Sequence, residues 1–317
     1  MTSSRTILSN LRSLKAYLNP ILTSEQPTYF EKLIAETFSN ILYLPLYTSD
    51  NDNPNIPHRV TWQGSINPVS KAPKGKPDVI AYCYNYYLII EATLKTEASQ
   101  CSKEYASSIR HCEDFCNHNG ISQKDAFVLI VCTELHGDTY RTIKNNSVEE
   151  RSKFIPIKIS ELEKILQTSI LAFTLRHLEL RKLFYDISDC IRDSSSLTAF
   201  SKSVDRSITE WQKEVLILEK NAYIGVKSYE AMRKIGKNHI STSEILKKLQ
   251  KHTIVKQYLN IIGENISIKV IEDSLIQQSF AARLTTTYAG EGLFDTLPYE
   301  DFKRRNLKLI DAVMKIK

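Results

Sequence analysis

The strongest constraint on the fold is an uninterrupted apolar run at residues 126–132, Ala-Phe-Val-Leu-Ile-Val-Cys. A run of strand length without a charged side chain is expected where a strand is buried on both faces of a sheet. Residues 79–84 and 86–94 are two further apolar and aromatic strands, and Asn85 between them indicates a tight hairpin. The chain is therefore expected to build a sheet with helices on both sides.

The segments around these strands follow helical or edge-strand patterns. Residues 27–42 carry apolar side chains at the helical period, and residues 97–117 continue the helical pattern until Asn119-Gly120 stops it. Residues 154–159 form a short strand whose proline predicts an edge position. Ser160 and Glu163 predict a capping box that opens a helix reaching about residue 181.

This order of elements predicts an α/β domain over residues 1–193. Beyond it, residues 194–317 are mostly helical, with one clearly capped helix at residues 240–249. We therefore expect a catalytic domain at 1–193 and a helical DNA-binding or subunit-interaction domain at 194–317.

Composition limits the class of protein. The chain of 317 residues is 42% hydrophobic and 25% charged, which is typical of a soluble globular protein. No apolar stretch approaches the roughly 20 residues that a membrane span needs, and residues 7–14 lack the features of a secretory signal. The six cysteines form no CxxC pair, which favours a reduced chain. We expect a cytoplasmic protein without a membrane partner.

The charge is unevenly distributed. Residues 201–317 contain 20 Lys and Arg against 14 Asp and Glu, whereas residues 1–200 contain 22 of each, so the C-terminal part carries the whole net charge of +6. A basic second domain would suit binding to a polyanion. A solvated helical surface rich in lysine is the simpler alternative.

Acidic residues recur at regular spacing at the ends of the predicted hairpin strands. Asp78 precedes the first strand, Glu91 lies thirteen residues later in the second, Glu104 thirteen after that, and His111 seven further on. Antiparallel pairing across Asn85 would bring Asp78 near Glu91.

The helix that follows adds a polar stripe. Gln100, Glu104, Ser107 or Ser108, and His111 share one face of that helix. Carboxylates and an imidazole that converge in this way fit a metal-dependent phosphodiesterase.

Pro77-Asp78 followed by Glu91-Ala92-Thr93 resembles the PD-(D/E)xK nuclease superfamily, with threonine in place of the usual lysine. The chain is similar to the branch of AlwI-type and MlyI-type Type IIS restriction endonucleases, in which Glu-x-Thr is usual and a glutamate and a histidine follow on a helix. Glu104 and His111 match these two. The resemblance covers roughly residues 28–135 and implies a restriction-endonuclease-like mixed sheet flanked by helices.

The resemblance also implies roles for individual residues. Asp78 and Glu91 would bind Mg²⁺, the Ala92 carbonyl is a plausible third ligand, and the N-terminal helix would add Glu31, with Glu36 as second choice. Because Thr93 carries no positive charge, Glu104 and His111 would hold a second metal ion, orient the attacking water or relay its proton. Lys76 and Lys95 are the cations expected to contact DNA phosphates.

Each of these residues also has a structural interpretation. Glu91 could be an edge-strand charge, Glu104 an exposed helix residue and His111 a core histidine. The sequence His111-Cys112-x-x-x-Cys116-x-His118 could suggest zinc, but adjacent helical residues point about 100° apart, and packed thiols explain the cysteines equally well.

The sequence thus predicts a Mg²⁺-dependent endonuclease acting on double-stranded DNA, most specifically a Type IIS-like restriction endonuclease or its cleavage subunit. A single site cuts one strand, so a second subunit or a homodimer is expected for double-strand cleavage. The alternatives are a catalytically inactive DNA-binding or assembly subunit with a nuclease-like fold, and a nuclease of transposition or repair.

Overall fold

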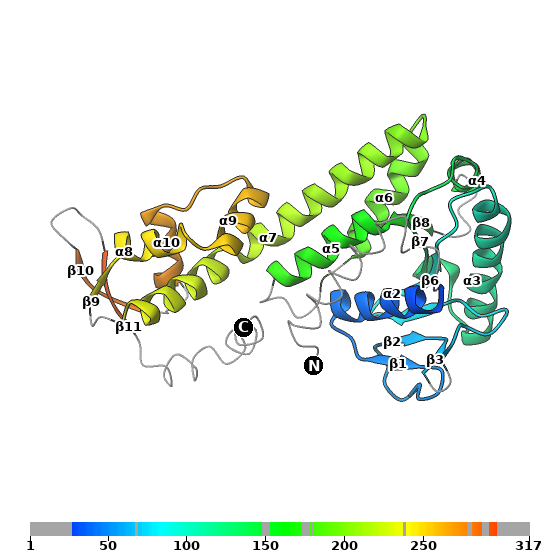
Figure 1. The fold of residues 1–317 in the computed structure, drawn as a ribbon, viewed down its shortest axis with the longest axis horizontal. Helices are drawn as coiled ribbons and strands as arrows, with labels where there is room; N and C mark the ends of the chain where they lie inside the picture. The colour runs from blue at the N-terminus through cyan, green and yellow to red at the C-terminus, as the bar shows by residue number, and fades with distance from the viewer. Residues whose placement is uncertain are drawn as a thin grey trace. The chain divides into compact units, whose positions relative to one another are not determined.

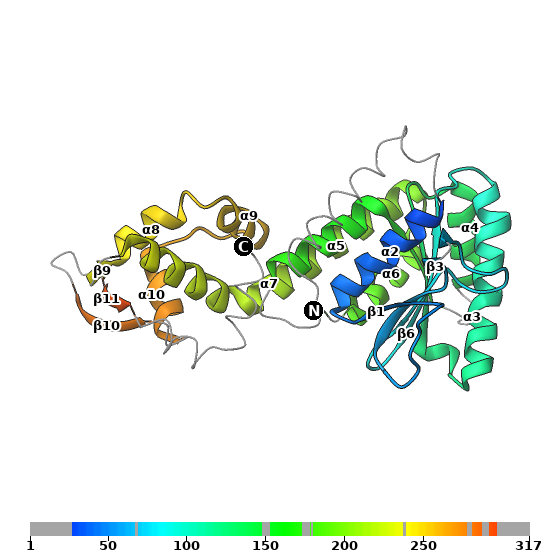
Figure 2. The same cartoon turned by 60° about the horizontal axis from the view of Figure 1, so that its bottom comes forward.

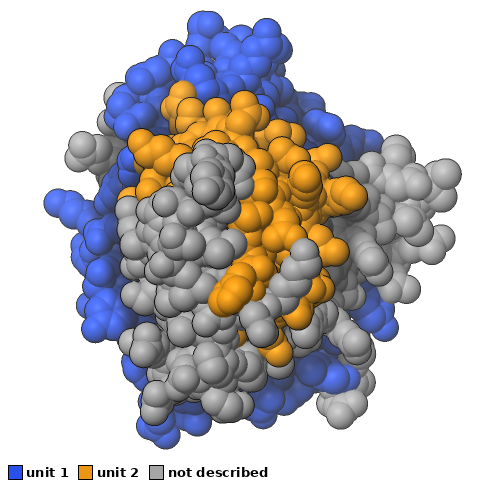
Figure 3. All heavy atoms as spheres, turned by 90° about the vertical axis from the view of Figure 1, so that its left-hand side faces the viewer, with its two compact units in different colours: residues 1–169, 177–208 blue, residues 170–176, 209–317 orange. Residues whose placement is uncertain are grey.

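A computed structural model describes most of the chain between residues 27 and 296, and all structural statements below refer to these residues. The described ranges are 27–66, 69–147, 153–172, 178, 180–236, 239–277, 281–286 and 292–296. The chain forms two compact units, shown in different colours in Figure 3: residues 1–169 with 177–208, and residues 170–176 with 209–317. The assignment of separate functions to 1–193 and 194–317 stays a prediction.

A six-stranded mixed sheet forms the centre of the first unit. Its strand order is β1-β2-β5-β6-β7-β8. The pairs β2/β5 and β5/β6 are antiparallel, and the pairs β1/β2, β6/β7 and β7/β8 are parallel. The strand bounds are Leu46–Thr48, Arg59–Trp62, Val79–Tyr82, Tyr87–Thr93, Ala126–Cys132 and Lys153–Lys158. The prolyl strand β8 lies at the edge, as its sequence predicted.

Every residue of β7 is buried, which agrees with a strand that is covered on both faces. Figures 1 and 2 show α2 (Pro27–Leu42) and α5 (Ile159–Leu171) on one side of the sheet and α3 (Ala106–Asn119) on the other. The predicted mixed sheet flanked by helices is confirmed. A small separate ladder pairs β3 (Ser65–Ile66) with β4 (Val69–Ser70).

Local sequence explains where the helices of this unit begin and end. The apolar stripe of α2 is buried, and the residue that follows its end at Leu42, Tyr43, adopts a left-handed conformation. Gly120, with φ of 63°, ends α3 as expected. The remaining elements are a π-helical turn η1 (Gln100–Tyr105), a 3₁₀ turn η2 (Gln123–Asp125), α4 (Gly137–Ser147), α6 (Arg181–Asp193) and the start of α7 (Leu197–Ile235).

One helix prediction was wrong in its details. The helix expected to run from Ser160 to about residue 181 begins at Ile159 and ends at Leu171. Its first turn is held by Glu161, whose carboxylate accepts the Lys158 N–H at 2.8 Å, so Ser160 is not the cap.

The second unit contains the rest of α7, three shorter helices and a three-stranded antiparallel sheet of order β10-β11-β9. Its other elements are β9 (His239–Ser241), α8 (Thr242–Leu249), α9 (Thr253–Ile262), α10 (Ile268–Gln277), β10 (Ala281–Thr286) and β11 (Gly292–Thr296). Ser241 and Glu244 form the capping box of α8, which confirms the capped helix expected at 240–249. This unit is mostly helical, as predicted.

No described helix combines the length and the apolar composition that crossing a membrane requires.

Candidate active site

The β5–β6 hairpin fixes the position of Asp78. Val79 pairs with Ile90 and Tyr82 with Tyr87, so the turn falls at Tyr84 and Asn85 as predicted. Continuing this register places Asp78 opposite Glu91. The Ala92 amide donates a hydrogen bond to Asp78 Oδ2 at 2.8 Å. The strand backbone itself therefore orients the Asp78 carboxylate.

Pro77 affects the hydrogen bonding at the same strand end. Extending the register places Pro77 opposite Ala92, and proline has no backbone N–H to donate. In a strand, the N–H and C=O of one residue point to the same neighbouring strand. The Ala92 carbonyl therefore points toward the Asp78 side, where Pro77 cannot donate to it. This supports the expectation that this carbonyl is available as an oxygen ligand.

Glu91 and His111 form a buried pair. His111 Nδ1 lies 2.7 Å from Glu91 Oε1, and the two side chains are 8% and 4% exposed. His111 Nε2 is buried without a hydrogen-bond partner among the described residues. Glu91 is thus not an exposed edge charge, and His111 directly contacts one of the proposed metal ligands.

Glu104 lies in the π-helical turn η1 and forms an ion pair with Lys95. π-helical turns occur frequently at functional sites. The Thr93 hydroxyl accepts the Lys95 N–H at 3.1 Å, so Thr93 ends strand β6 and directs the chain toward this ion pair. Lys95, expected to contact phosphate, has its ammonium against a carboxylate in this structure.

The two candidates on α2 differ in their surroundings. Glu31 is buried, and its Oε2 accepts the Ala72 N–H at 3.4 Å. The charges of Glu31 and Asp78 interact, which places Glu31 near the other carboxylates. Glu36 instead lies 4.0 Å from Lys32 on its own helix. The geometry favours Glu31, the first choice from sequence.

The carboxylates raise one another's pKa. Burial is the largest cause of the raised pKa of Asp78, and the charge of Glu91 is the next. Burial also raises the pKa of Glu91, with further increases from Glu104 and Glu31. Burial raises the pKa of Glu31 more than the Ala72 N–H lowers it.

The pKa of the neighbouring imidazole, that of His111, shifts in the opposite direction. Burial lowers the pKa of His111, and the charge of Arg110 lowers it further. His111 is thus expected to be neutral at neutral pH. Buried like charges of this kind require either protons or a cation.

The donor set fits a hard divalent cation in its chemistry. Carboxylate and carbonyl oxygens are the ligands that Mg²⁺ prefers, and the site offers Asp78, Glu91, Glu31 and the Ala92 carbonyl. As the side chains stand, the described residues contain no group of three Asp, Glu, His or Cys side chains arranged to hold a metal ion.

Gln100 is a site-forming residue that the assignment of roles from sequence left out. Its side chain is fully buried, and Nε2 donates to the carbonyls of Lys95 at 2.7 Å and Glu134 at 2.9 Å. Its Oε1 accepts the His136 N–H at 2.9 Å. Gln100 therefore joins the segments after β6 and β7 to the start of η1. Its place in the polar stripe with Glu104 was the available signal.

The remaining sequence candidates are Lys76 and the residues considered for zinc, Cys112, Cys116 and His118. Lys76 is exposed in the turn before Asp78, where its N–H donates to the Pro73 carbonyl at 3.1 Å. Cys112 and Cys116 are buried in α3, and His118 is exposed. The packing of these thiols agrees with the alternative to zinc.

Comparison with known proteins finds one family model that matches part of the first unit. Residues 18–165 match the family model described as AlwI restriction endonuclease. A solved structure of the small subunit (R.BspD6I2) of the heterodimeric restriction endonuclease R.BspD6I is similar at 19% identity and a TM-score of 0.43, covering 64% of this chain and 97% of the other. A search of curated proteins gave no match. The family match confirms the resemblance given by Pro77-Asp78 and Glu91-Ala92-Thr93.

Proposed function

We propose that this chain, whose residues 18–165 match the AlwI restriction endonuclease family model, is a Mg²⁺-dependent Type IIS-like restriction endonuclease or the cleavage subunit of one. Its substrate is double-stranded DNA, and it acts in the cytoplasm. The observation that carries this proposal is the strand end where the Ala92 amide binds Asp78 beside the buried carboxylate of Glu91.

Asp78, Glu91 and the Ala92 carbonyl would hold the metal ion, with Glu31 as a further oxygen donor. When bound, Mg²⁺ neutralises charge on the scissile phosphate and provides a water of lowered pKa for the attack. His111 holds Glu91 through Nδ1 and so limits the rotation of this carboxylate. A neutral imidazole also leaves Nε2 able to accept a proton.

Lys95 supplies the positive charge that Thr93 lacks. Its side chain is 44% exposed and paired with Glu104, so the ammonium stands at the solvent side of the carboxylates. An ammonium there would stabilise charge developing on the phosphate. The exposed lysines of the preceding loop, Lys71, Lys74 and Lys76, would contact the DNA backbone.

Cleavage of both strands requires a second active site, because one such site hydrolyses one strand. We propose that this comes from a homodimer or from a different subunit.

One observation favours the second candidate function, an inactive DNA-binding or assembly subunit. The Thr93 hydroxyl is engaged with the Lys95 N–H, so position 93 serves strand termination and not charge stabilisation. A nuclease of transposition or repair would use the same chemistry on a different substrate. Defined fragment ends would indicate restriction, whereas random or structure-dependent cuts would indicate repair.

The test is cleavage of plasmid DNA with Mg²⁺ by the wild type, Asp78→Ala and Glu91→Ala. Each variant should cleave at least about 1,000-fold more slowly, because metal-ion charge stabilisation is worth several kcal/mol and each 1.4 kcal/mol is tenfold. Glu210→Ala, an exposed carboxylate on α7, is the matched control and should cleave normally.

Calorimetric titration with Mn²⁺ gives a readout that does not depend on cleavage, and both site variants should lose binding. Equal behaviour of the wild type and both variants, with and without candidate partner subunits, would leave the inactive subunit as the better description.

A further inference from the structure

The second unit contains an arrangement of helices that the proposed cleavage chemistry does not use. Helices α8 and α9 are joined by the three-residue turn Gln250-Lys251-His252, because α8 ends at Leu249 and α9 begins at Thr253. Two helices joined by such a short turn are typical of a helix-turn-helix, in which the second helix enters the major groove of DNA.

One face of α9 is polar and exposed. Thr253, Lys256, Gln257 and Asn260 follow the spacing that places side chains on the same side of a helix, and all four are exposed. Their side chains make no hydrogen bond or ion pair within the part of the chain that the structure describes. The opposite face is buried through Val255, Tyr258, Leu259 and Ile262.

Lysines outnumber carboxylates around this face. Residues 245–263 contain four lysines, at positions 247, 248, 251 and 256, and no Asp or Glu. The next carboxylate, Glu264, is held by Lys220 at 2.9 and 3.0 Å. The preceding one, Glu244, is engaged in the α8 capping box. Glu230 of α7 acts on His252 in the turn and is paired with Lys227 at 3.2 Å. Because these nearby carboxylates are engaged, the excess of lysine favours a polyanion.

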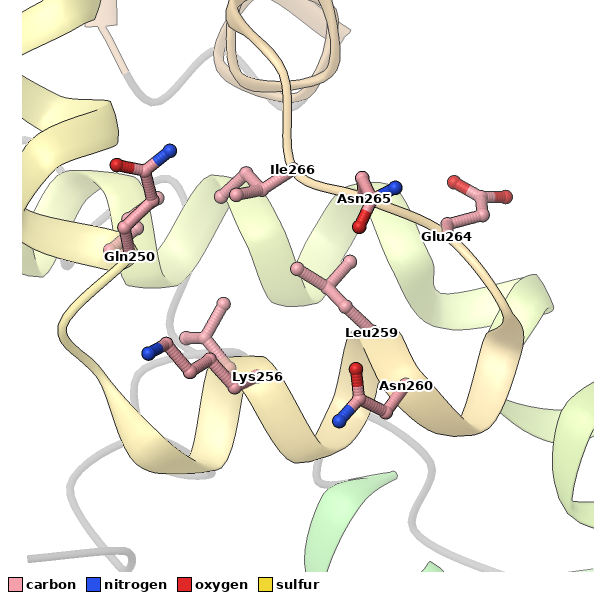
Figure 4. A pocket seen from close by; sticks show the side chains of 9 residues that line it. Gln250, Lys256, Leu259, Asn260, Glu264, Asn265 and Ile266 are labelled. Carbon is pink, nitrogen blue, oxygen red and sulfur yellow. The ribbon is translucent and has the colours of Figure 1, made fainter.

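A hollow of about 330 Å³ lies beside α9, shown in Figure 4. Leu259 and Ile266 line it, and Gln250, Lys256 and Asn260 also border it. Glu264, paired with Lys220, also borders it, so the hollow suits a base edge better than a phosphate. A base edge that enters here would meet polar side chains from both the turn and the helix.

Helix α9 is held against α7 by Tyr258. The Tyr258 ring stacks on Tyr223 of α7 with centroids 4.0 Å apart and planes 4° from parallel. The Tyr258 hydroxyl donates to the Leu216 carbonyl, also on α7. A binding surface on a helix that is already held in place loses little conformational entropy when a ligand binds.

We propose that α9 is a recognition helix that enters the major groove of double-stranded DNA. Gln257 and Asn260 read base edges, and Lys256 reads guanine or the adjacent backbone, because amides pair with adenine and lysine with guanine. Lys247, Lys248 and Lys251 contact phosphates. A protein partner fits less well, since protein interfaces are depleted of lysine and enriched in aromatic residues. The proposal deepens the proposed function by naming the surface that selects the DNA.

The test uses the full-length protein without divalent metal, so that binding is measured without cleavage. Duplexes selected by the wild type from a random pool are titrated by fluorescence anisotropy. Gln257→Ala and Asn260→Ala should each weaken binding to the selected sequence by about 5- to 150-fold, the worth of a bidentate base contact, and leave affinity for random DNA nearly unchanged. Lys247→Ala should weaken both equally and reduce the salt slope by about one.

Asn117→Ala on α3 and Lys202→Ala on α7 are matched controls from exposed helix positions in the first unit. Each variant should keep the wild-type thermal midpoint, which separates a lost contact from a lost fold. The inference is overturned if the Gln257→Ala/Asn260→Ala double variant binds the selected duplex like the wild type. It is also overturned if the wild type binds no duplex DNA, or binds duplex RNA of the same sequence equally well.

These outcomes are distinct from failure of the proposed function. A wild type that binds DNA through α9 but does not cut it with Mg²⁺ would remove the nuclease activity and leave the recognition helix in place.

Discussion

Replacing Gln100 by alanine tests whether the segments around the carboxylates are held by one buried amide. The substitution removes three hydrogen bonds and orphans the carbonyls of Lys95 and Glu134 and the N–H of His136. With a net contribution of about 1 kcal/mol for each bond, the free energy of unfolding should fall by about 3 kcal/mol. For a unit of this size, the thermal midpoint should drop by about 6–12 °C.

Urea unfolding followed by circular dichroism measures this loss. Gln100→Glu keeps the size and the acceptor oxygen but loses both donated hydrogen bonds, so it should be destabilised although it leaves no cavity. Gln167→Ala, at a partly exposed helical glutamine without a side-chain hydrogen bond in the described structure, is the control and should be nearly neutral.

Cleavage kinetics separate positioning from plain stability. Because Gln100 holds the Lys95 segment and the start of η1, kcat should fall while KM for DNA stays the same at temperatures where the variant is folded. The reasoning is refuted if Gln100→Ala loses less than about 1 kcal/mol and cleaves at the wild-type rate.

Two further predictions concern the ionisable groups. The folded protein keeps protons on Asp78, Glu91 and Glu31 at pH values where the unfolded chain has released them, because their pKa values are raised. The free energy of unfolding of the metal-free protein should therefore fall as the pH rises above about 4, toward the raised pKa values. An Asp78→Asn/Glu91→Gln variant should show a flatter dependence in denaturant titrations, and an equally steep one would contradict this origin. His111→Ala should slow cleavage by about 100- to 10,000-fold with nearly unchanged DNA affinity, measured by single-turnover cleavage and anisotropy; a matching loss of affinity would contradict a role on Glu91 or the water.

The sequence predicted the sheet well because its strands carry strong local signals. The apolar run of β7, the turn at Asn85 and the proline of β8 each have a single physical interpretation, and all three were confirmed. The start of α5 was harder to predict, since Ser160 and Glu161 can both cap a helix and only the backbone direction decides between them.

The contacts within the candidate site were less accessible to sequence reasoning. The spacing of Asp78, Glu91 and His111 was sufficient to bring them together, because hairpin register and helix phase are local properties. The pairing of Lys95 with Glu104 depends on the path of the chain beyond β6 and on the π-helical turn, and neither has a sequence signature. The interactions of Gln100 reach residues 34 and 36 positions away, which periodicity cannot reveal.

The hydrogen bond from the Ala92 amide to Asp78 has a consequence for tolerance to mutation. Since the donor belongs to the main chain, nineteen of the twenty amino acids at position 92 could provide it, and proline alone could not. The middle residue of the Glu-x-Thr motif is therefore free to vary in side chain while its peptide group aims the neighbouring carboxylate. Strand pairing determines the geometry of this part of the site. Substitutions that preserve the hairpin therefore leave this geometry intact.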